Sequence, residues 1–172
     1  MKSLKKSIFR QYDIRGIYGE DLHDHDAELI GKAFGSMVLE RGESWVVVGR
    51  DNRKSSPVLF NYLVQGLLST GVNVLNIGVV ISPIFYYAAH LYQIGSGLMI
   101  TASHNPSAYN GFKVLSGGHT IYGEALQVLR EKAGKGNFAR GFGTMESRSP
   151  VPAYTEMMKS KVNLGNKKIK VV

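Results

Sequence analysis

Short apolar runs alternate with segments of helical periodicity through the middle of the chain. The runs over 44–49, 72–77 and 97–101 each predict a buried strand. Between them, apolar residues recur at helical spacing over 57–69 and 83–92, and each of these segments begins with a proline. The order strand, helix, strand, helix, strand predicts parallel strands joined by crossover helices.

The flanking segments extend this pattern on both sides. Apolar positions over 26–39 and 124–132 predict two further helices, and 111–115 predicts a strand beside the one at 97–101. Ser56 is expected to cap the helix that Pro57 opens. The predicted fold is therefore α/β, a three-layer α/β/α sandwich with a mostly parallel mixed sheet.

The last quarter of the chain has a different texture. Residues 133–149 are rich in Gly, Lys and Arg and read as a loop or linker, 152–162 predicts one more helix, and 167–172 predicts the beginning of a strand. A strand with no sequence after it suggests the front part of something longer. We expect a first domain over 1–150, followed by a linker helix and a first strand of a second domain over 151–172.

Composition narrows the class of protein. The 172 residues include no cysteine, which excludes disulfides and cysteine nucleophiles and is consistent with a reducing compartment, the cytoplasm by default. No apolar run approaches the roughly 20 residues of a membrane span. A soluble cytoplasmic protein without a membrane partner is expected.

The net charge of +8 is unevenly distributed. Residues 1–129 hold 11 Lys/Arg and 10 Asp/Glu, whereas residues 130–172 hold 10 and 3. The basic residues are not interleaved with stacking aromatics and match no nucleic-acid module. We therefore expect no nucleic-acid partner, and read the basic end as a solvated or partner-facing surface.

The segment T-A-S-H-N-P over 101–106 carries the strongest candidate chemistry. It follows the third predicted strand, and functional groups collect at the carboxyl ends of strands in open parallel sheets. The alternative is a plain turn, since Ser, Asn and Asn-Pro favour turns. A serine hydrolase is disfavoured, because the G-x-S-x-G elbow is absent and nothing designates an acid for His104.

Two other polar clusters are interpreted as structural. His23 and His25 have no designated third ligand, which disfavours a metal site. The segment 50–53 could resemble a phosphate clamp, but the better interpretation is a structural loop in which Ser55 and Ser56 cap the next helix.

The chain then resembles a known family in five ordered segments. T-A-S-H-N-P with the following Y-N-G-F-K over 109–113 resembles the phosphoserine loop of the α-D-phosphohexomutases. Four other segments resemble the same family's first domain, with Y-D-I-R-G pointing to the phosphomannomutase/phosphoglucomutase branch: 9–16, 48–57, 66–71 and 77–78. The resemblance covers residues 8 to 132.

The resemblance implies a reaction and a cofactor. These enzymes move a phosphoryl group between the 1- and 6-hydroxyls of a hexose through a bisphosphorylated sugar, with a phosphoserine, here Ser103, as donor and acceptor. It also implies Mg²⁺ bound by the Ser103 phosphate and by a D-G-D-G-D-R loop, which this sequence lacks. The implied partners are hexose phosphates and the remaining domains of the same enzyme, so the chain alone is expected to be inactive. The alternative is a free-standing binding or regulatory module derived from that domain.

The resemblance also assigns roles to residues around Ser103. Lys113 matches a lysine that helps proton transfer, Arg15 an arginine close to the phosphoserine, and His104 the neighbour of the phosphoserine. The alternatives are an exposed strand lysine, an ion pair of Arg15 with Asp13, and a turn histidine. Asn105 is expected to be mainly structural, and Tyr12 to line the site or to pack in the core.

Overall fold

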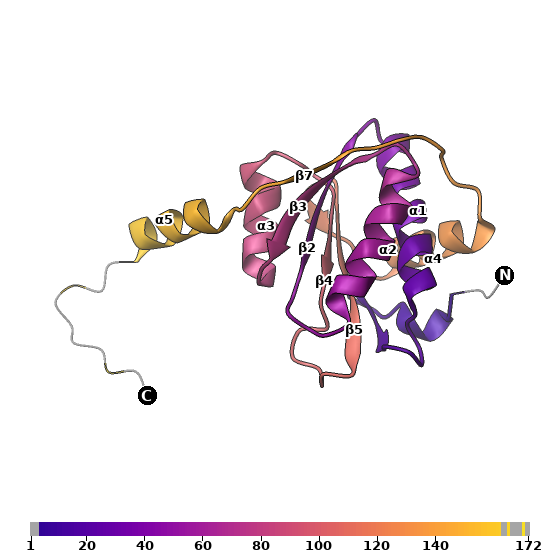
Figure 1. Cartoon of the computed structure of the whole chain (residues 1–172), viewed down its shortest axis with the longest axis horizontal. Coiled ribbons are helices and arrows are strands. Elements are labelled where there is room, and N and C mark those ends of the chain that lie inside the picture. Colours follow the sequence, from indigo (N-terminus) through magenta and orange to yellow (C-terminus); the bar gives the residue numbers. More distant parts are fainter. Residues whose placement is uncertain (1–3, 163–164, 166–169, 171–172) are drawn as a thin grey trace.

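The molecule is built of three layers, with a sheet between two layers of helices (Figure 1). The computed structural model describes residues 4–162, 165 and 170. Helices α1, α2 and α4 cover one face of the sheet and α3 covers the other. This arrangement confirms the predicted α/β/α sandwich.

The sheet has the strand order β1-β5-β4-β2-β3-β7. The short strand β6 pairs with Leu115 and Ser116 of β5, beyond the residues that pair with β1. Strand β2 is parallel to β3 and β4, and β3 is parallel to β7, whereas β5 is antiparallel to β1, β4 and β6. Among the described strands, only β5 therefore runs against the others, and the sheet is mostly parallel as predicted. The strands are β1 (Ile14–Ile17), β2 (Trp45–Arg50), β3 (Asn73–Val79), β4 (Gly97–Ile100), β5 (Tyr109–Ser116), β6 (His119–Thr120) and β7 (Met145–Ser147).

The five α-helices lie within three residues of their predicted positions, and the short 3₁₀ helix η1 (Lys6–Ile8) was not predicted. The α-helices are α1 (Asp24–Glu40), α2 (Ser56–Leu68), α3 (Ser82–Leu91), α4 (Glu124–Lys135) and α5 (Val151–Lys161). Helix α1 begins two residues earlier than expected because His23 and Asp26 form a capping box. Tyr18, just after β1, donates to Asp24 at the start of α1, and this hydrogen bond raises the pKa of Tyr18 to about 12.

The predicted serine cap of α2 is wrong. Ser56 is the first helical residue rather than the N-cap, and the N-cap residue Ser55 makes no side-chain capping bond. Both hydroxyls instead accept a hydrogen bond from the buried Asn110 on β5, at 2.8 and 3.0 Å. The two serines therefore fasten the loop after β2 to the neighbouring part of the sheet.

The prediction of a loop over 133–149 is also wrong in part. Helix α4 continues to Lys135, and Met145–Ser147 forms the edge strand β7. All three residues of β7 are exposed, so no apolar pattern marks the strand in the sequence. The strand predicted over 167–172 lies outside the described residues except for Lys170.

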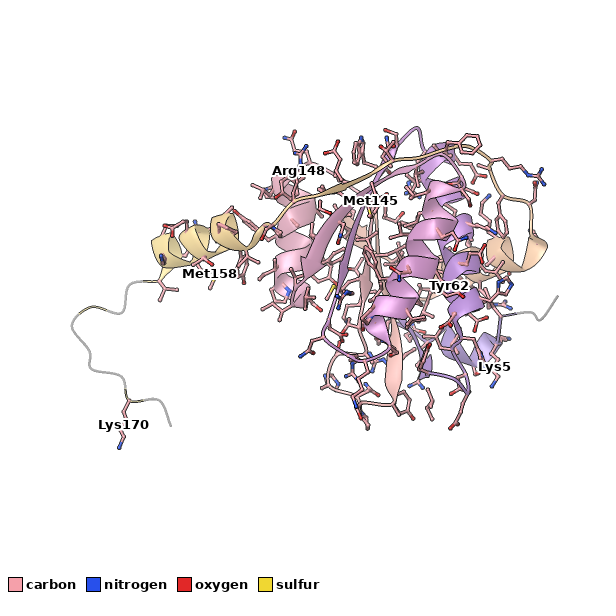
Figure 2. All side chains as sticks on the ribbon, viewed as in Figure 1. Lys5, Tyr62, Met145, Arg148, Met158 and Lys170 are labelled. Carbon is pink, nitrogen blue, oxygen red and sulfur yellow. The ribbon has the colours of Figure 1, made fainter. Side chains whose placement is uncertain are left out.

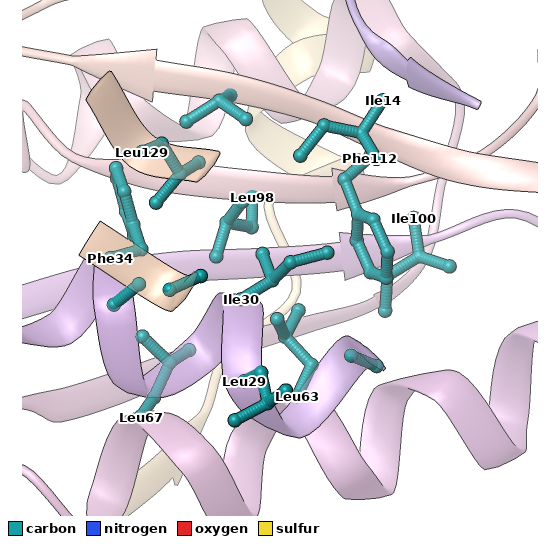
Figure 3. Packing of buried hydrophobic residues seen from close by; sticks show 14 of the residues in the cluster. Ile14, Leu29, Ile30, Phe34, Leu63, Leu67, Leu98, Ile100, Phe112 and Leu129 are labelled. Carbon is teal, nitrogen blue, oxygen red and sulfur yellow. The ribbon is translucent and has the colours of Figure 1, made fainter. Parts of the chain in front are cut away.

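Two apolar clusters, one on each face of the sheet, form the core. Figure 3 shows the larger one, in which Phe34 of α1, Leu67 of α2 and Leu129 of α4 converge on the strands. Helices α1 and α2 approach closely at Gly31 and Gly66, where an added Cβ would overlap a backbone carbonyl of the opposite helix. The smaller cluster packs α3 against β2, β3 and β4.

The chain leaves this body through an extended segment and α5. Figure 2 shows Met145 and Arg148 along that segment and Met158 on α5, which extends away from the sheet. No residue of α5 is buried, and Tyr154 meets Tyr87 of α3 with ring centroids 5.3 Å apart. In the described part of the chain, no helix is long and apolar enough to cross a membrane.

Candidate functional site

The loops that follow β2, β3 and β4 meet at one edge of the sheet and enclose an open cleft of about 800 Å³. This is the carboxyl edge of the parallel strands, where ligands bind in open α/β sheets. The cleft is lined by Asp51, Asn52, Arg53, Lys54, Val80, Ile81, Ser82, Pro83, Met99, Thr101, Ser103, Asn105, Ser107 and Ala108. The structure thus places two of the residues that the sequence singled out, Ser103 and Asn105, in one cleft.

Ser103 has an unusual backbone conformation. Its φ is +53°, in the left-handed region that a residue with a Cβ rarely adopts, and its side chain is exposed. Such a conformation costs about 1–3 kcal/mol and persists only where the surroundings enforce it. Locally, the Ser103 amide donates to Thr101 Oγ1 at 2.9 Å. The serine hydroxyl is therefore presented to the cleft by a strained turn.

Asn105 forms hydrogen bonds within the turn. Its amide and its Nδ2 both donate to the carbonyl of Ala102, each at 3.1 Å. These two hydrogen bonds to the Ala102 carbonyl close the turn around Ser103 and His104. His104 itself is exposed at the tip of the turn.

Sequence reasoning missed the residue that holds this turn from outside. Arg53 Nη1 donates to the carbonyls of Pro106 and Tyr109 at 2.7 and 3.1 Å. Its Nη2 donates to the carbonyls of Ser103 and Asn105 at 2.8 and 2.7 Å. The partners lie 50–56 residues away in the sequence, so no local pattern could have identified them.

Asp51 fixes the orientation of Arg53. Its Oδ2 accepts from Arg53 Nε at 3.1 Å, and its Oδ1 accepts from the Arg53 amide and from Ser56 Oγ. The segment 50–53 is thus a structural loop, as predicted, but it supports the serine turn as well as the start of α2.

Arg15 and Lys113 lie on β1 and β5, the two strands beyond β4, and neither is among the residues that line the cleft. Arg15 of β1 pairs with Gly111 of β5, and the Gly111 carbonyl accepts from the amide of Thr101 at 3.0 Å. Arg15 is therefore level with the start of the serine turn. Lys113 lies two residues along β5 from Gly111, so the two cations share one face of the sheet, at the diagonal spacing of about 7–8 Å.

The ion pair that the sequence offered as an alternative for Arg15 is present. Arg15 Nη2 donates to Asp13 Oδ2, and the arginine side chain is 16% exposed. Its Nε is the one buried side-chain nitrogen or oxygen without a hydrogen-bond partner in the part of the chain that the structure describes. Arg15 is thus a mostly buried guanidinium with a fixed partner, and its unpaired Nε is itself buried.

The remaining predicted site residue, Tyr12, does not pack in the core. Its side chain is 70% exposed and its ring lies 6.4 Å from that of Tyr122, between centroids. The alternative of core packing is therefore wrong.

The described residues offer few ligands for a metal ion near Ser103. The described residues contain no group of three or more His, Asp or Glu side chains that could hold a metal ion. A phosphate on Ser103 would supply one oxygen ligand, and the near carboxylate Asp51 is already occupied by Arg53 and Ser56. Within the described chain, the site fits a metal only as a partial ligand set.

The arrangement suits transfer of an anionic group. Ser103 is exposed at the end of β4, and the basic residues Arg15 and Lys113 lie on β1 and β5, on the same side of β4. Preorganised positive groups stabilise charge that develops on a transferred anion.

Comparison with known proteins agrees with this chemistry. The family described as phosphoglucomutase/phosphomannomutase, alpha/beta/alpha domain I, matches residues 6–140. A phosphomannomutase/phosphoglucomutase of Pseudomonas aeruginosa is 44% identical over 170 residues, 99% of this chain and 36% of the relative. A phosphoglucomutase of Neisseria meningitidis is 48% identical over 139 residues, 81% of this chain and 30% of the relative.

Solved structures show the same fold. A phosphoglucomutase/phosphomannomutase family protein from Burkholderia thailandensis superposes with a TM-score of 0.89 at 38% identity, covering 94% of this chain and 37% of the other. A protein described as a putative phosphomannomutase from Thermus thermophilus gives a TM-score of 0.80 at 27% identity. On this evidence, the chain belongs to the phosphoglucomutase/phosphomannomutase family and corresponds to its α/β/α domain I.

Proposed function

We propose that Ser103 carries the phosphoryl group of a phosphohexomutase and that the chain is the phosphoserine-bearing domain of that enzyme. The observation that carries the proposal is the exposed, left-handed Ser103 at the carboxyl end of β4, in a chain of this family. The proposed substrates are the 1- and 6-phosphates of glucose or mannose. The support for this choice is that the relatives are named phosphomannomutase/phosphoglucomutase and phosphoglucomutase.

The transfer step follows from this assignment. The bond between phosphorus and Ser103 Oγ breaks while a sugar hydroxyl oxygen bonds to phosphorus, and the hydroxyl proton passes to a base. Ser103 Oγ regains a proton. In the second transfer Ser103 Oγ loses that proton to a base and bonds to the phosphorus at the other end of the bisphosphorylated sugar, while the bond from that phosphorus to the sugar oxygen breaks and the oxygen takes up a proton, which restores the phosphoserine. Positioning and stabilisation of charge supply most of the rate in such reactions.

The flanking residues divide this work. Arg15, with a free Nε and a partner in Asp13, is proposed to bind the phosphoryl oxygens. Lys113, half-buried on the same face, is proposed to move the proton of the sugar hydroxyl, and the exposed His104 to shape the entrance. Tyr12 is proposed as a lining residue and Asn105 as a support of the turn.

A Mg²⁺ ion is proposed as the cofactor, with the Ser103 phosphate as its only ligand among the described residues. When bound, the ion would offset charge on the phosphoryl oxygens. The remaining ligands would come from other parts of the enzyme, and a cytoplasmic location would fit the lack of cysteine.

The chain spans about a third of the length of the curated relatives it matches, 36% for the Pseudomonas aeruginosa protein. We therefore propose that residues 1–150 form domain I and that 151–172 lead into a second domain. A free-standing binding module derived from domain I is the alternative, favoured by the observation that residues 4–162 already contain both cores.

The proposal is tested in two proteins, this chain and a hybrid that joins residues 1–172 to the remaining domains of the Pseudomonas aeruginosa relative. Incubation with glucose 1,6-bisphosphate is expected to leave one phosphate on Ser103, located by mass spectrometry of peptides. Ser103→Ala should reduce hybrid turnover at least about 10³-fold, since it removes the group that forms the covalent intermediate.

The matched control is Ser116→Ala, at the other end of β5 and away from the cleft. It should change turnover less than about threefold. Activity of Ser103→Ala near that of the unmodified hybrid, or phosphate found only on another residue, would refute the assignment.

A further inference from the structure

We propose that Arg53 is the positioning residue of the serine turn, holding Ser103 in its left-handed conformation for phosphoryl transfer. The inference rests on the proposed function of Ser103. It concerns a residue that need not contact the sugar or the transferred phosphoryl group, because it acts through the backbone of the turn.

The hydrogen bonds of Arg53 carry the inference. A guanidinium has five N–H donors in a fixed plane, and all five are used here. Nε binds the Asp51 carboxylate, and the four Nη donors bind the carbonyls of Ser103, Asn105, Pro106 and Tyr109. Arg53 therefore spans the whole turn from Ser103 to the first residue of β5.

These bonds oppose the strain of the turn. With φ at +53°, Ser103 would relax toward an ordinary conformation if its carbonyl were free to rotate. Arg53 donates a hydrogen bond to that carbonyl at 2.8 Å and to the carbonyls of Asn105 and Pro106 at 2.7 Å each. Other hydrogen bonds also hold the turn: the Ser103 amide donates to Thr101 Oγ1, Asn105 donates twice to the Ala102 carbonyl, and the amides of Tyr109 and Tyr18 donate to the carbonyls of Pro106 and Ala108. Of the bonds described for the turn, that from Arg53 Nη2 is the one to the Ser103 carbonyl.

The ion pair of Arg53 with Asp51, which anchors the contacts to the turn, is largely shielded from solvent. The Arg53 side chain is 13% exposed and that of Asp51 18%. Asp51 is in turn bound by Ser56, whose hydroxyl also accepts from the fully buried Asn110. The position of Ser103 is thus coupled to the start of α2 and to β5 through side chains that water reaches only partly.

Arg53 and Arg15 differ in the use of their donors. The Nε of Arg15 makes no hydrogen bond to the protein, whereas all five N–H donors of Arg53 are used by the protein. Loss of Arg53 should therefore lower the rate of transfer far more than the binding of sugar phosphate. A lysine cannot replace it, since three donors from one nitrogen cannot reach four carbonyls and a carboxylate.

The first experiment measures kcat and KM of the hybrid mutase with Arg53→Lys and Arg53→Ala. We expect kcat to fall at least about 10²-fold in both, since displacement of reacting groups by about 1 Å costs that much, while KM changes less than about threefold. Arg41→Lys is the control. This substitution removes hydrogen bonds of Arg41 to Glu43 and Ser96, which lie just before β2 and β4, at the end of the sheet away from the cleft. It should leave kcat unchanged.

The second experiment uses this chain alone and needs no catalysis. Amide hydrogen exchange by NMR should show the amides of Ser103, Asn105 and Tyr109 exchanging at least about tenfold faster in Arg53→Lys, while amides of α1 and β2 keep their rates. In Arg41→Lys the three turn amides should be unaffected. If Arg53→Ala does not fold, Arg53→Lys, which keeps the charge, decides.

The outcomes separate the two proposals. Unchanged exchange of the turn in Arg53→Lys, a kcat within threefold of the parent, or an equal loss of kcat in Arg41→Lys would each overturn the positioning role. An inactive parent hybrid with Ser103 unphosphorylated would refute the proposed function instead, and the exchange data would still decide whether Arg53 holds the turn.

Discussion

At the scale of single residues, Ser103 stands out because its conformation favours presentation of the hydroxyl over stability. Glycine adopts a φ of +53° without the Cβ clash, so Ser103→Gly should relieve strain. Glycine also gives the unfolded chain more freedom, which offsets part of the gain. We expect a rise of up to about 1 kcal/mol in the free energy of unfolding, measured in urea, together with complete loss of phosphorylation.

Gln93 offers a matched control for this experiment. It is the other non-glycine residue with positive φ in the described chain, at +54°, and it follows α3 at the opposite edge of the sheet. Gln93→Gly should gain similar stability without affecting phosphorylation of Ser103. A loss of more than about 0.5 kcal/mol in Ser103→Gly would show that the turn is not strained.

The residues of the site differ in how far the sequence could predict them. Ser103, His104 and Asn105 are contiguous and follow a clear apolar strand, so their shared location could be predicted. Arg15 and Lys113 could be assigned only through the family resemblance, because their common face depends on antiparallel pairing of β1 with β5. Arg53 lies beyond both approaches, since its role consists of contacts with carbonyls that any residue type provides.

At the scale of elements, the packing of α1 on α2 depends on glycines at the crossing. A Cβ at Gly66 would overlap the carbonyl oxygen of Glu28, which is backbone and cannot move aside alone. Gly66→Ala should therefore push the helices apart and lower the free energy of unfolding by about 3 kcal/mol. Thermal and urea unfolding of the chain measure this loss.

Gly134 is the matched control, since it also lies inside a helix, α4. An added Cβ there meets nothing within 4 Å, so Gly134→Ala should raise stability by about 0.5–1 kcal/mol through helix propensity alone. Equal effects of the two substitutions would contradict the close approach of α1 and α2.

The long helices and the central strands could be predicted from their apolar patterns, whereas the short strands β1 and β7 could not. Strands β2 and β4 are largely buried and consist mainly of apolar residues, and β3 keeps apolar residues on either side of Asn76. Strand β7 has three exposed side chains, and β1 has a charged arginine in four residues. Both depend on pairing with a neighbour far along the chain, β3 and β5, which single-sequence periodicity does not report.

At the scale of the whole molecule, the cleft beside Ser103 is open to solvent. The chain supplies the serine turn and two cations, and the donor set for a metal is incomplete among the described residues. The relatives are nearly three times as long, with this chain covering 36% of the first and 30% of another. Most of the length of those enzymes therefore lies outside the part that this chain matches.

The chain should accordingly interconvert no hexose phosphates alone, even when Ser103 is phosphorylated. Loss of one preorganised charge-stabilising donor costs about 10²–10³ in rate, and several such groups would have to come from the rest of the enzyme. Slow hydrolysis of the phosphoserine is the most that we expect.

A coupled assay from glucose 1-phosphate and from mannose 1-phosphate, with Mg²⁺ and a bisphosphate activator, measures the turnover of residues 1–172 beside that of the hybrid. A turnover of about 1–10³ per second for the chain alone, the ordinary range for enzymes, would mean that the site is complete within these residues and that the proposal of further domains is wrong.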